Sequence, residues 1–243
     1  MLVRFAKQNE VRQIFESVET VSWAPWLAAS SELIRKRIQN FPDGQLLAEE
    51  SGKIAGYLSL NRISLDASGQ WPEWFGVVGA YEDFGNFDLK GNTLFLVSMG
   101  VALEYRGSGV TSLLIKHAKD LAKKSNLGLA SCFRPSGFGQ YKFEHKELIP
   151  MSEYVKLKDN FGQPIDPWLR SLAKNGARFL GVKNDYYKKI IPTSEFEIYK
   201  KNYKKDYWWN KDGVWECMEA GSFVKNEDGG YTYLESNVCG LID

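Results

Sequence analysis

The sequence predicts a mixed α/β fold, and three stretches carry that prediction. Residues 93–103 are almost all apolar or small, which is typical of a strand that is buried on both faces. Two glycines end this strand, and an amphipathic helix follows from Val110. A second apolar stretch covers residues 128–133. Strand, helix and strand in this order predict a parallel pair joined by a right-handed crossover.

The elements before the central strand add antiparallel pairing. A helix is expected around residues 11–18, and a second one follows Ser30 or Ser31, either of which can serve as its N-cap. Residues 45–50 and 53–60 then predict an antiparallel hairpin joined at Ser51 and Gly52. The sheet is therefore expected to be mixed.

Two stretches fit no helical or strand period. Residues 64–92 carry six aromatic side chains, which favours either a surface flap packed on its own rings or a lid over a substrate site. Residues 140–163 form a second irregular insertion. A sheet domain with two long insertions is the expected result.

The last third of the chain continues the same domain. Asp166 and Pro167 are strong signals for the start of a helix, and a short strand is expected at residues 179–182. Residues 183–243 show no linker composition and include a predicted capping box at Ser194 and Glu197. We expect a domain of residues 1–182 and a C-terminal extension, residues 183–243, packed on that domain.

Composition excludes several classes of partner. The 243 residues carry a net charge of +1 and a pI near 7.6, so we expect neither nucleic acid nor a membrane as a partner. The three cysteines are widely spaced and form no disulfide or metal pattern, which favours a reducing compartment. We therefore expect a cytoplasmic location and no bound metal.

The glycine turn predicts an anion site. A helix that begins at such a turn presents N–H donors and the positive end of its dipole, and Arg106 stands beside it. Three nucleotide motifs fail here: the Rossmann fingerprint lacks its third glycine, the P-loop lacks its lysine, and a kinase loop needs a strand after the glycines. The Ser-nucleophile elbow lacks its first glycine. A phosphate or diphosphate site remains.

The pattern Arg106-x-x-Gly109-x-Thr111, after a buried strand and opening a helix, resembles the acyl-CoA-binding motif of the GNAT acyltransferases. The element order over residues 1–182 is similar as well, and residues 166–177 resemble GNAT-type proteins that are found beside natural-product assembly lines. The resemblance implies a GNAT-like fold in which the central strand and the next one splay apart. Coenzyme A would then lie against the residues of the strand end and the turn: Met99, Gly100, Val101, Arg106, Gly107, Ser108, Gly109, Val110 and Thr111.

The same resemblance exposes two unfilled roles. The family's leaving-group tyrosine corresponds to Leu172, and its early-strand glutamate corresponds to about Thr93, so neither position supplies an acid or a base. The substitute candidates for catalysis are His145, Ser136 and Tyr141. Arg134, Ser136 and Tyr141 are the candidates for binding the acceptor substrate.

The resemblance implies an acyltransferase that uses acetyl-CoA or another acyl-CoA as cosubstrate. The leading hypothesis is an N-acetyltransferase that acts directly on a small-molecule amine. Two alternatives stay open, namely loading or decarboxylation of an acyl group on an acyl carrier protein, and a non-catalytic coenzyme A-binding protein. The sequence leaves the acceptor and the oligomeric state undetermined.

Overall fold

The computed structural model describes residues 1–66 and 70–243, and these form two compact units. The first unit comprises Met1–Ser131 with Leu241–Asp243, and the second comprises Cys132–Gly240. The predicted boundary between residues 182 and 183 falls inside β6 (Ala177–Ile191), a strand that is far longer than the expected short one. Each unit is described below by itself.

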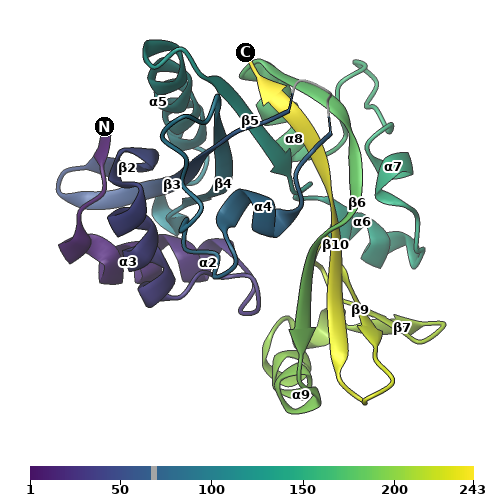
Figure 1. The fold of residues 1–243 in the computed structure, drawn as a ribbon. Helices are drawn as coiled ribbons and strands as arrows, with labels where there is room; N and C mark the ends of the chain where they lie inside the picture. The colour runs from purple at the N-terminus through teal and green to yellow at the C-terminus, as the bar shows by residue number, and fades with distance from the viewer. Residues whose placement is uncertain (67–69) are drawn as a thin grey trace. The chain divides into compact units, whose positions relative to one another are not determined.

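The first unit is built on a mixed sheet, as the sequence predicts (Figure 1). The strands β1 to β4 pair antiparallel in chain order, and β4 pairs parallel with β5. The expected hairpin is present as β2 and β3. The bounds of the strands are β1 (Leu2–Phe5), β2 (Gln45–Glu50), β3 (Lys53–Ile63), β4 (Thr93–Val101) and β5 (Gly128–Phe133). Cys132 and Phe133 at the end of β5 already belong to the second unit.

Helices cover both faces of this sheet. On one face, Val110 and Leu114 of α5 fill the space where a side chain on Gly56 would stand. On the other face, Val18 and Ser22 occupy the corresponding space above Gly100. Besides short 3-10 turns, the helices of this unit are α1 (Val11–Ile14), the π-helical turn η2 (Phe15–Glu19), α2 (Thr20–Ser22), α3 (Ser31–Asn40), α4 (Trp74–Val78) and α5 (Val110–Lys124).

The first insertion is anchored to α3. Arg37 Nε donates to the carbonyl of Glu82 at 2.8 Å, and Asn40 donates to the carbonyl of Asp83 at 2.8 Å. Phe84 is fully buried, with the Arg37 guanidinium 4.9 Å from its ring centroid. These contacts favour the flap over the lid. Residues 67–69 of the insertion lie outside the described residues.

The second unit carries two long strands, β6 and β10 (Tyr231–Ile242), together with shorter strands and several short helices. The helices are α6 (Phe138–His145), α7 (Met151–Tyr154), α8 (Pro167–Lys174) and α9 (Thr193–Asn202). The insertion expected at residues 140–163 is irregular only in part, because the end of α6 and the short helix α7 lie within it. The shorter strands are β7 (Trp209–Lys211), β8 (Val214–Glu216) and β9 (Ser222–Lys225).

An aromatic cluster holds α9 on these strands. The ring of Phe196 stacks on Tyr231 with 3.7 Å between centroids, and it meets Trp208 and Phe223 edge-on. The predicted capping box is wrong, since the helix N-cap is Pro192 and no side chain caps it. Packing of rings therefore fixes this helix more than its terminal hydrogen bonds do.

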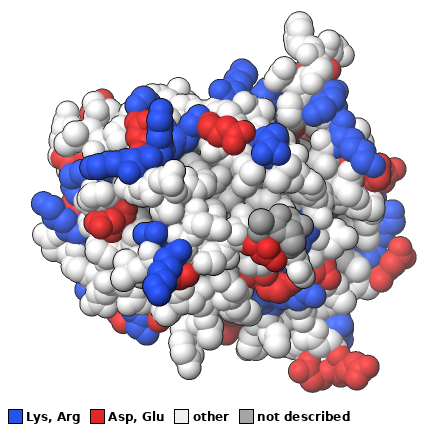
Figure 2. Space-filling view, turned by 45° about the horizontal axis from the view of Figure 1, so that its top comes forward, with Lys and Arg blue, Asp and Glu red and all other residues white. Residues whose placement is uncertain are grey.

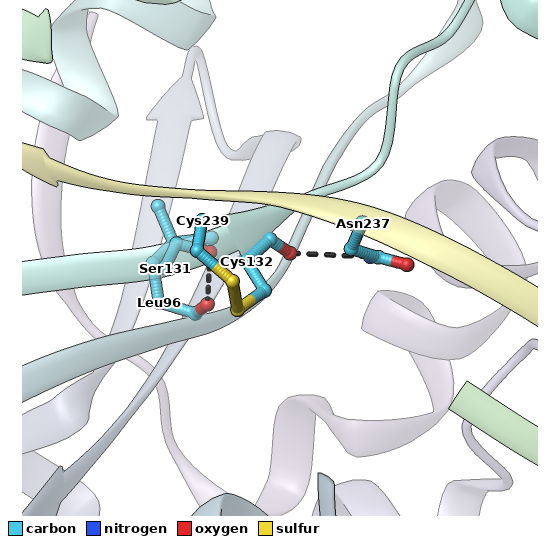
Figure 3. The surroundings of a disulfide bond; sticks show 5 residues. All are labelled: Leu96, Ser131, Cys132, Asn237 and Cys239. Carbon is cyan, nitrogen blue, oxygen red and sulfur yellow. Dashed lines mark hydrogen bonds between the residues drawn. A yellow bond between two sulfur atoms is a disulfide. The ribbon is translucent and has the colours of Figure 1, made fainter. Parts of the chain in front are cut away.

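The cysteine prediction needs a correction. Cys132 at the end of β5 forms a disulfide with Cys239 of β10, although the two are separated by 107 positions (Figure 3). Asn237 adds a hydrogen bond to the carbonyl of Cys132 at 3.2 Å. The third cysteine, Cys217, is a buried free thiol. Spacing alone gave no sign of the pair, and the cytoplasmic location stays a prediction.

Two surface observations concern partners. Among residues 1–66 and 70–243, no helix combines the length and the apolar character that crossing a membrane requires. The face drawn in Figure 2 carries Lys and Arg side chains interspersed with Asp and Glu. This mixed surface agrees with the near-neutral net charge of the chain.

Candidate functional site

The pairing between β4 and β5 is short. Thr93–Phe95 pair with Gly128–Ala130, whereas β4 continues to Val101. One step farther, the hydroxyl of Ser131 donates to the carbonyl of Leu96 at 2.7 Å (Figure 3). Within the described residues, none of positions 97–101 is paired with a residue of β5. This edge of β4 therefore offers backbone N–H and C=O groups to another extended chain.

A β-bulge explains why the pairing ends there. In the register with β3, Ser59 lies opposite Ser98 and Leu60 lies opposite Leu96, so Val97 is an extra residue. A bulge bends its strand and leaves one backbone group outside the ladder. Val97 comes two residues after the last pair with β5. The bulge thus bends β4 at the point where its parallel neighbour is lost.

The glycine turn after β4 is open on its outer side. Gly107 has φ +79° and Gly109 has φ +85°, which L side chains rarely adopt. Both glycines are exposed, and no atom of the described residues beyond the adjoining backbone lies within 4 Å of the place where a Cβ would stand. The backbone of the turn can therefore be approached closely by a ligand.

Arg106 lies beside the turn and is exposed. Its Nη2 donates to the carbonyl of Val21 at 2.7 Å, which ties the side chain to the end of α2. A guanidinium has five N–H donors, and this bond uses one of them. The positive charge is thus held at the turn and is not packed into the interior.

The start of α5 completes the arrangement. Val110 is buried against Gly56 and fixes the helix on the sheet. The first N–H groups of a helix have no intrahelical acceptor, and the helix dipole places positive charge there. The first turn of α5 carries no acidic side chain that would compete with a bound anion for these N–H groups. Turn, Arg106 and helix start together suit a phosphate or diphosphate.

The family resemblance implies a base at about Thr93 and an acid at Leu172. Both side chains have structural roles in this protein. The Thr93 hydroxyl donates to the side chain of Asn92 at 2.8 Å, and Leu172 is fully buried in α8. His117, on α5, has its Nδ1 3.0 Å from the carbonyl of Leu113. This pairing of a helix histidine with its own backbone is a structural role.

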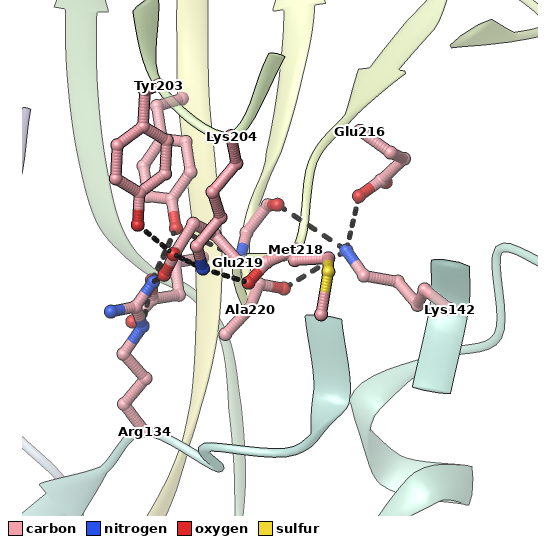
Figure 4. Close-up of polar contacts among 11 residues, drawn as sticks. Arg134, Lys142, Tyr203, Lys204, Glu216, Met218, Glu219 and Ala220 are labelled. Atoms are coloured by element: carbon pink, nitrogen blue, oxygen red, sulfur yellow. Dashed lines mark hydrogen bonds and ion pairs between the residues drawn. The ribbon is translucent and has the colours of Figure 1, made fainter. Parts of the chain in front are cut away.

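Arg134 lies in the second unit and is held by two carboxylates (Figure 4). Its Nη2 lies 2.6 Å from Glu219, and its Nε lies 2.9 Å from Glu235. Its charge is therefore already balanced within the unit. Its predicted role in binding an acceptor stays a prediction.

Glu219 is the centre of this network. It also accepts hydrogen bonds from Tyr203 at 2.5 Å and from Lys204 at 2.8 Å. Burial acts to raise the pKa of Glu219, but the charges of Arg134 and Lys204 outweigh it and leave the pKa lowered. At Glu235, burial dominates and raises the pKa. The two carboxylates of one network are thus tuned in opposite directions.

A second buried pair lies nearby in the same unit (Figure 4). Lys142 of α6 lies 2.5 Å from Glu216, and the two side chains are 3% and 0% exposed. The ammonium group also donates to the carbonyl of Ala220 at 3.2 Å, while the hydroxyl of Ser222 donates to Glu216. Burial raises the pKa of Glu216. The pair fixes α6 on the strand connections of this unit.

The remaining candidates also lie in the second unit. Tyr141 and His145 come together on α6, with ring centroids 4.0 Å apart and the histidine Nδ1 2.8 Å from the tyrosine carbonyl. His145 and Ser136 are exposed, whereas Tyr141 is half-buried beside Tyr154. All three stay predictions. The candidates for coenzyme A binding lie in the first unit.

Sequence reasoning missed the partners of Arg134. Glu219 and Glu235 follow it by 85 and 101 positions, and neither belongs to a motif. In the sequence, Tyr203 and Lys204 belong to a stretch rich in aromatic and basic residues, which gives no indication of their contact with Glu219. Such contacts depend on tertiary structure, and no local signal identifies them.

Comparison with solved structures finds similar folds. The structure described as the GphF GNAT-like decarboxylase in complex with isobutyryl-CoA has a TM-score of 0.64 and 22% identity, covering 77% of this chain and 91% of that chain. The loading GNATL domain of CurA from Lyngbya majuscula has a TM-score of 0.64 and 21% identity, covering 76% and 88%. Ard1 from Thermoplasma volcanium has a TM-score of 0.51 and 10% identity, covering 100% and 97%.

A search of curated proteins found no match. The family model described as the acetyltransferase (GNAT) family matches residues 9–135, which is more than half of the chain. This range contains the bulged strand β4, the glycine turn and the start of α5. The chain belongs to the GNAT acetyltransferase family.

Proposed function

We propose that this protein transfers a short acyl group, acetyl first among them, from an acyl-CoA to the amine of a small molecule. The observation that carries the proposal is the open edge of β4 from Val97 to Val101, which is followed, after a short 3-10 turn at Leu103–Tyr105, by the glycine turn and the start of α5. A long thioester with an anionic end fits an extended edge followed by an anion site.

The binding roles follow from this order of elements. The backbone of Met99 and Val101 would pair with the pantetheine arm as with a neighbouring strand, and Gly100 lies between them. The diphosphate would be held by the N–H groups and the guanidinium of Arg106, Gly107, Ser108, Gly109, Val110 and Thr111. The positive φ angles of Gly107 and Gly109 and the open space beside them support a close approach of phosphate oxygens.

The chemistry is a direct transfer. The amine nitrogen attacks the carbonyl carbon of the thioester, a C–N bond forms, and the C–S bond breaks with its electron pair on sulfur. A backbone N–H beside the bulge at Val97 would stabilise the oxygen that gains negative charge, and the extra residue in the register with β3 supports this role. Positioning of the two reactants supplies a large part of the rate.

Calorimetry and a thiol-release assay test the proposal together. Acetyl-CoA should bind with a dissociation constant of about micromolar order, as cosubstrates of enzymes commonly do. Coenzyme A thiol should then appear when a panel of amino acids, polyamines and arylalkylamines is added. A titration that gives no heat up to millimolar acetyl-CoA would reject the function.

A second candidate is acyl transfer to a carrier protein. It is supported by the two solved structures with a TM-score of 0.64, whose names describe a GNAT-like decarboxylase and a loading domain. It is also supported by Thr93 and Leu172, because neither side chain can act as the base or the acid that the family resemblance implies at these positions. Acylation of a carrier phosphopantetheine with no transfer to any amine would favour it. Binding of acetyl-CoA without turnover of any acceptor would indicate a coenzyme A-binding protein instead.

A further inference from the structure

We propose that the hydroxyl groups of Ser98 and Ser22 hold the attacking amine and that Ser98 relays its proton to the departing sulfur. This inference rests on the proposed function, because it requires the thioester to lie along β4. It assigns a proton acceptor and donor to a site in which Thr93 and Leu172 stand where the family resemblance implies a glutamate base and a tyrosine acid.

Ser98 lies on β4, one residue after the bulge. It is 8% exposed, and its Oγ has no hydrogen-bond partner among the described residues. A buried hydroxyl without a partner costs stability, so native proteins keep few of them. Such a group commonly serves a ligand or a reaction.

Neighbouring polar groups on the same face of the sheet behave differently. Ser59, which lies directly opposite Ser98, donates to Gln45 Oε1 at 2.8 Å. Tyr57 donates to the same oxygen at 2.6 Å. The fold therefore provides partners for buried hydroxyls here, and Ser98 is an exception within the described part of the chain.

Ser22 lies over the same face. Its Oγ also has no partner among the described residues, and it lies 2.6 Å from the place where a Cβ on Gly100 would stand. Gly100 is two positions from Ser98, so both face the same side of the sheet. Ser22 ends α2, directly after the π-helical turn at Phe15–Glu19, and such turns are frequent at functional sites. Two hydroxyls thus meet the unpaired segment of β4 from one side.

The direction of attack selects this side. A thioester that extends along the edge of β4 has its carbonyl group near the plane of the sheet, so a nucleophile must approach from above or below that plane. On one side, Val110 and Leu114 of α5 fill the space above Gly56. On the other side stand the hydroxyls of Ser98 and Ser22. Side chains on strands point perpendicular to the sheet, which is also the direction of attack.

The proton balance needs no further group. As the C–N bond forms and the C–S bond breaks, the nitrogen must lose one proton and the sulfur must gain one. Ser98 Oγ accepts the proton from nitrogen while its own hydroxyl proton moves to sulfur. A hydroxyl can do both, because it is a donor and an acceptor. The products are the neutral amide and the coenzyme A thiol.

The test compares Ser98→Ala with Ser59→Ala. Acetyl-CoA serves as donor and hydroxylamine as a minimal amine acceptor, with released thiol measured above the uncatalysed rate. Ser98→Ala should lower kcat about 100-fold with the KM for acetyl-CoA unchanged, as expected for loss of proton transfer. Its Tm should equal or exceed that of the unchanged protein, because a buried hydroxyl without a partner is removed.

Ser59→Ala should show the reverse pattern, with a lower Tm and a kcat within about twofold of the unchanged protein. Ser98→Thr, which keeps the hydroxyl, should restore most of the kcat. An unchanged kcat in Ser98→Ala would overturn the proposal, and so would a loss of Tm equal to that of Ser59→Ala. Even if no acceptor reacts, the Tm comparison shows whether the Ser98 hydroxyl lacks a hydrogen-bond partner. A failure to bind acetyl-CoA would instead reject the proposed function itself.

Discussion

The two units use polar groups in different ways. In the first unit, the candidate site consists mainly of backbone: the free edge of β4, the bulge at Val97 and the turn at Gly107 and Gly109. In the second unit, buried charged side chains from distant positions hold the structure together, as Arg134 and Glu219 do. The comparison teaches that the glycine turn depends on local sequence, whereas the bulge, the free strand edge and the network of side chains depend on tertiary structure.

The largest expected effect concerns the disulfide of the second unit. A disulfide that closes a loop of about 100 residues stabilises a protein by about 4–5 kcal/mol in the chain-entropy description, and Cys132 and Cys239 are 107 positions apart. Reduction with dithiothreitol should therefore lower the urea midpoint strongly. Cys132→Ser should show the same midpoint with and without reductant. Equal midpoints for the oxidised and reduced chains would contradict this expectation.

The buried pair of the second unit should be nearly as sensitive. Lys142→Met leaves Glu216 as a buried carboxylate without its partner, which typically costs about 3–5 kcal/mol. The matched control is Lys116→Met, since Lys116 forms an exposed pair with Asp120 on α5. The control should leave the free energy of unfolding almost unchanged. Similar losses for both variants would remove the distinction between buried and exposed pairs.

Glu219 gives a smaller effect with a defined pH dependence. Its lowered pKa means that ionised Glu219 stabilises the folded state at pH values above its unfolded pKa of about 4.3, and this contribution is lost as the pH falls through the folded value. Glu219→Gln should thus cost about 2 kcal/mol at pH 7, the usual value for hydrogen bonds to a charged group. The difference between the two proteins should shrink in acid. A difference that stays constant from pH 7 to pH 3 would show that the charge is not responsible.

The glycine turn provides the smallest effect on stability and a specific effect on binding. Gly109→Ala places a side chain at φ +85°, which costs about 1–2 kcal/mol. Gly162→Ala is the matched control in the second unit, with φ +73° and open space beside it. Both variants should lose similar stability, but only Gly109→Ala should weaken acetyl-CoA binding, by about tenfold. If Gly109→Ala and the unchanged protein bound acetyl-CoA with equal affinity, the glycine turn would not take part in ligand binding.

Prediction from sequence succeeded where signals are local. The apolar run at residues 93–103, the two glycines and the periodic helix after Val110 all specify structure within a few residues, and the mixed sheet follows from them. The helix at Pro167–Lys174 was also predicted, because Asp166 caps it through a bond to the Leu169 N–H.

Prediction failed where contacts are long-range. The pairing of Cys132 with Cys239 has no signature in spacing, and the helices α6 and α7 depend on packing rather than on a regular apolar period. The bulge at Val97 was equally hidden, since a bulge is defined by the register with a neighbouring strand. In each case the decisive partner lies elsewhere in the chain.

Backbone hydrogen exchange with and without acetyl-CoA tests the central claim most directly. If the open edge of β4 receives the pantetheine arm, amides within residues 97–101 and 107–111 should exchange more slowly when the ligand is bound, because they gain hydrogen-bond acceptors. Binding measured by calorimetry with no added protection at residues 97–101 would contradict the account.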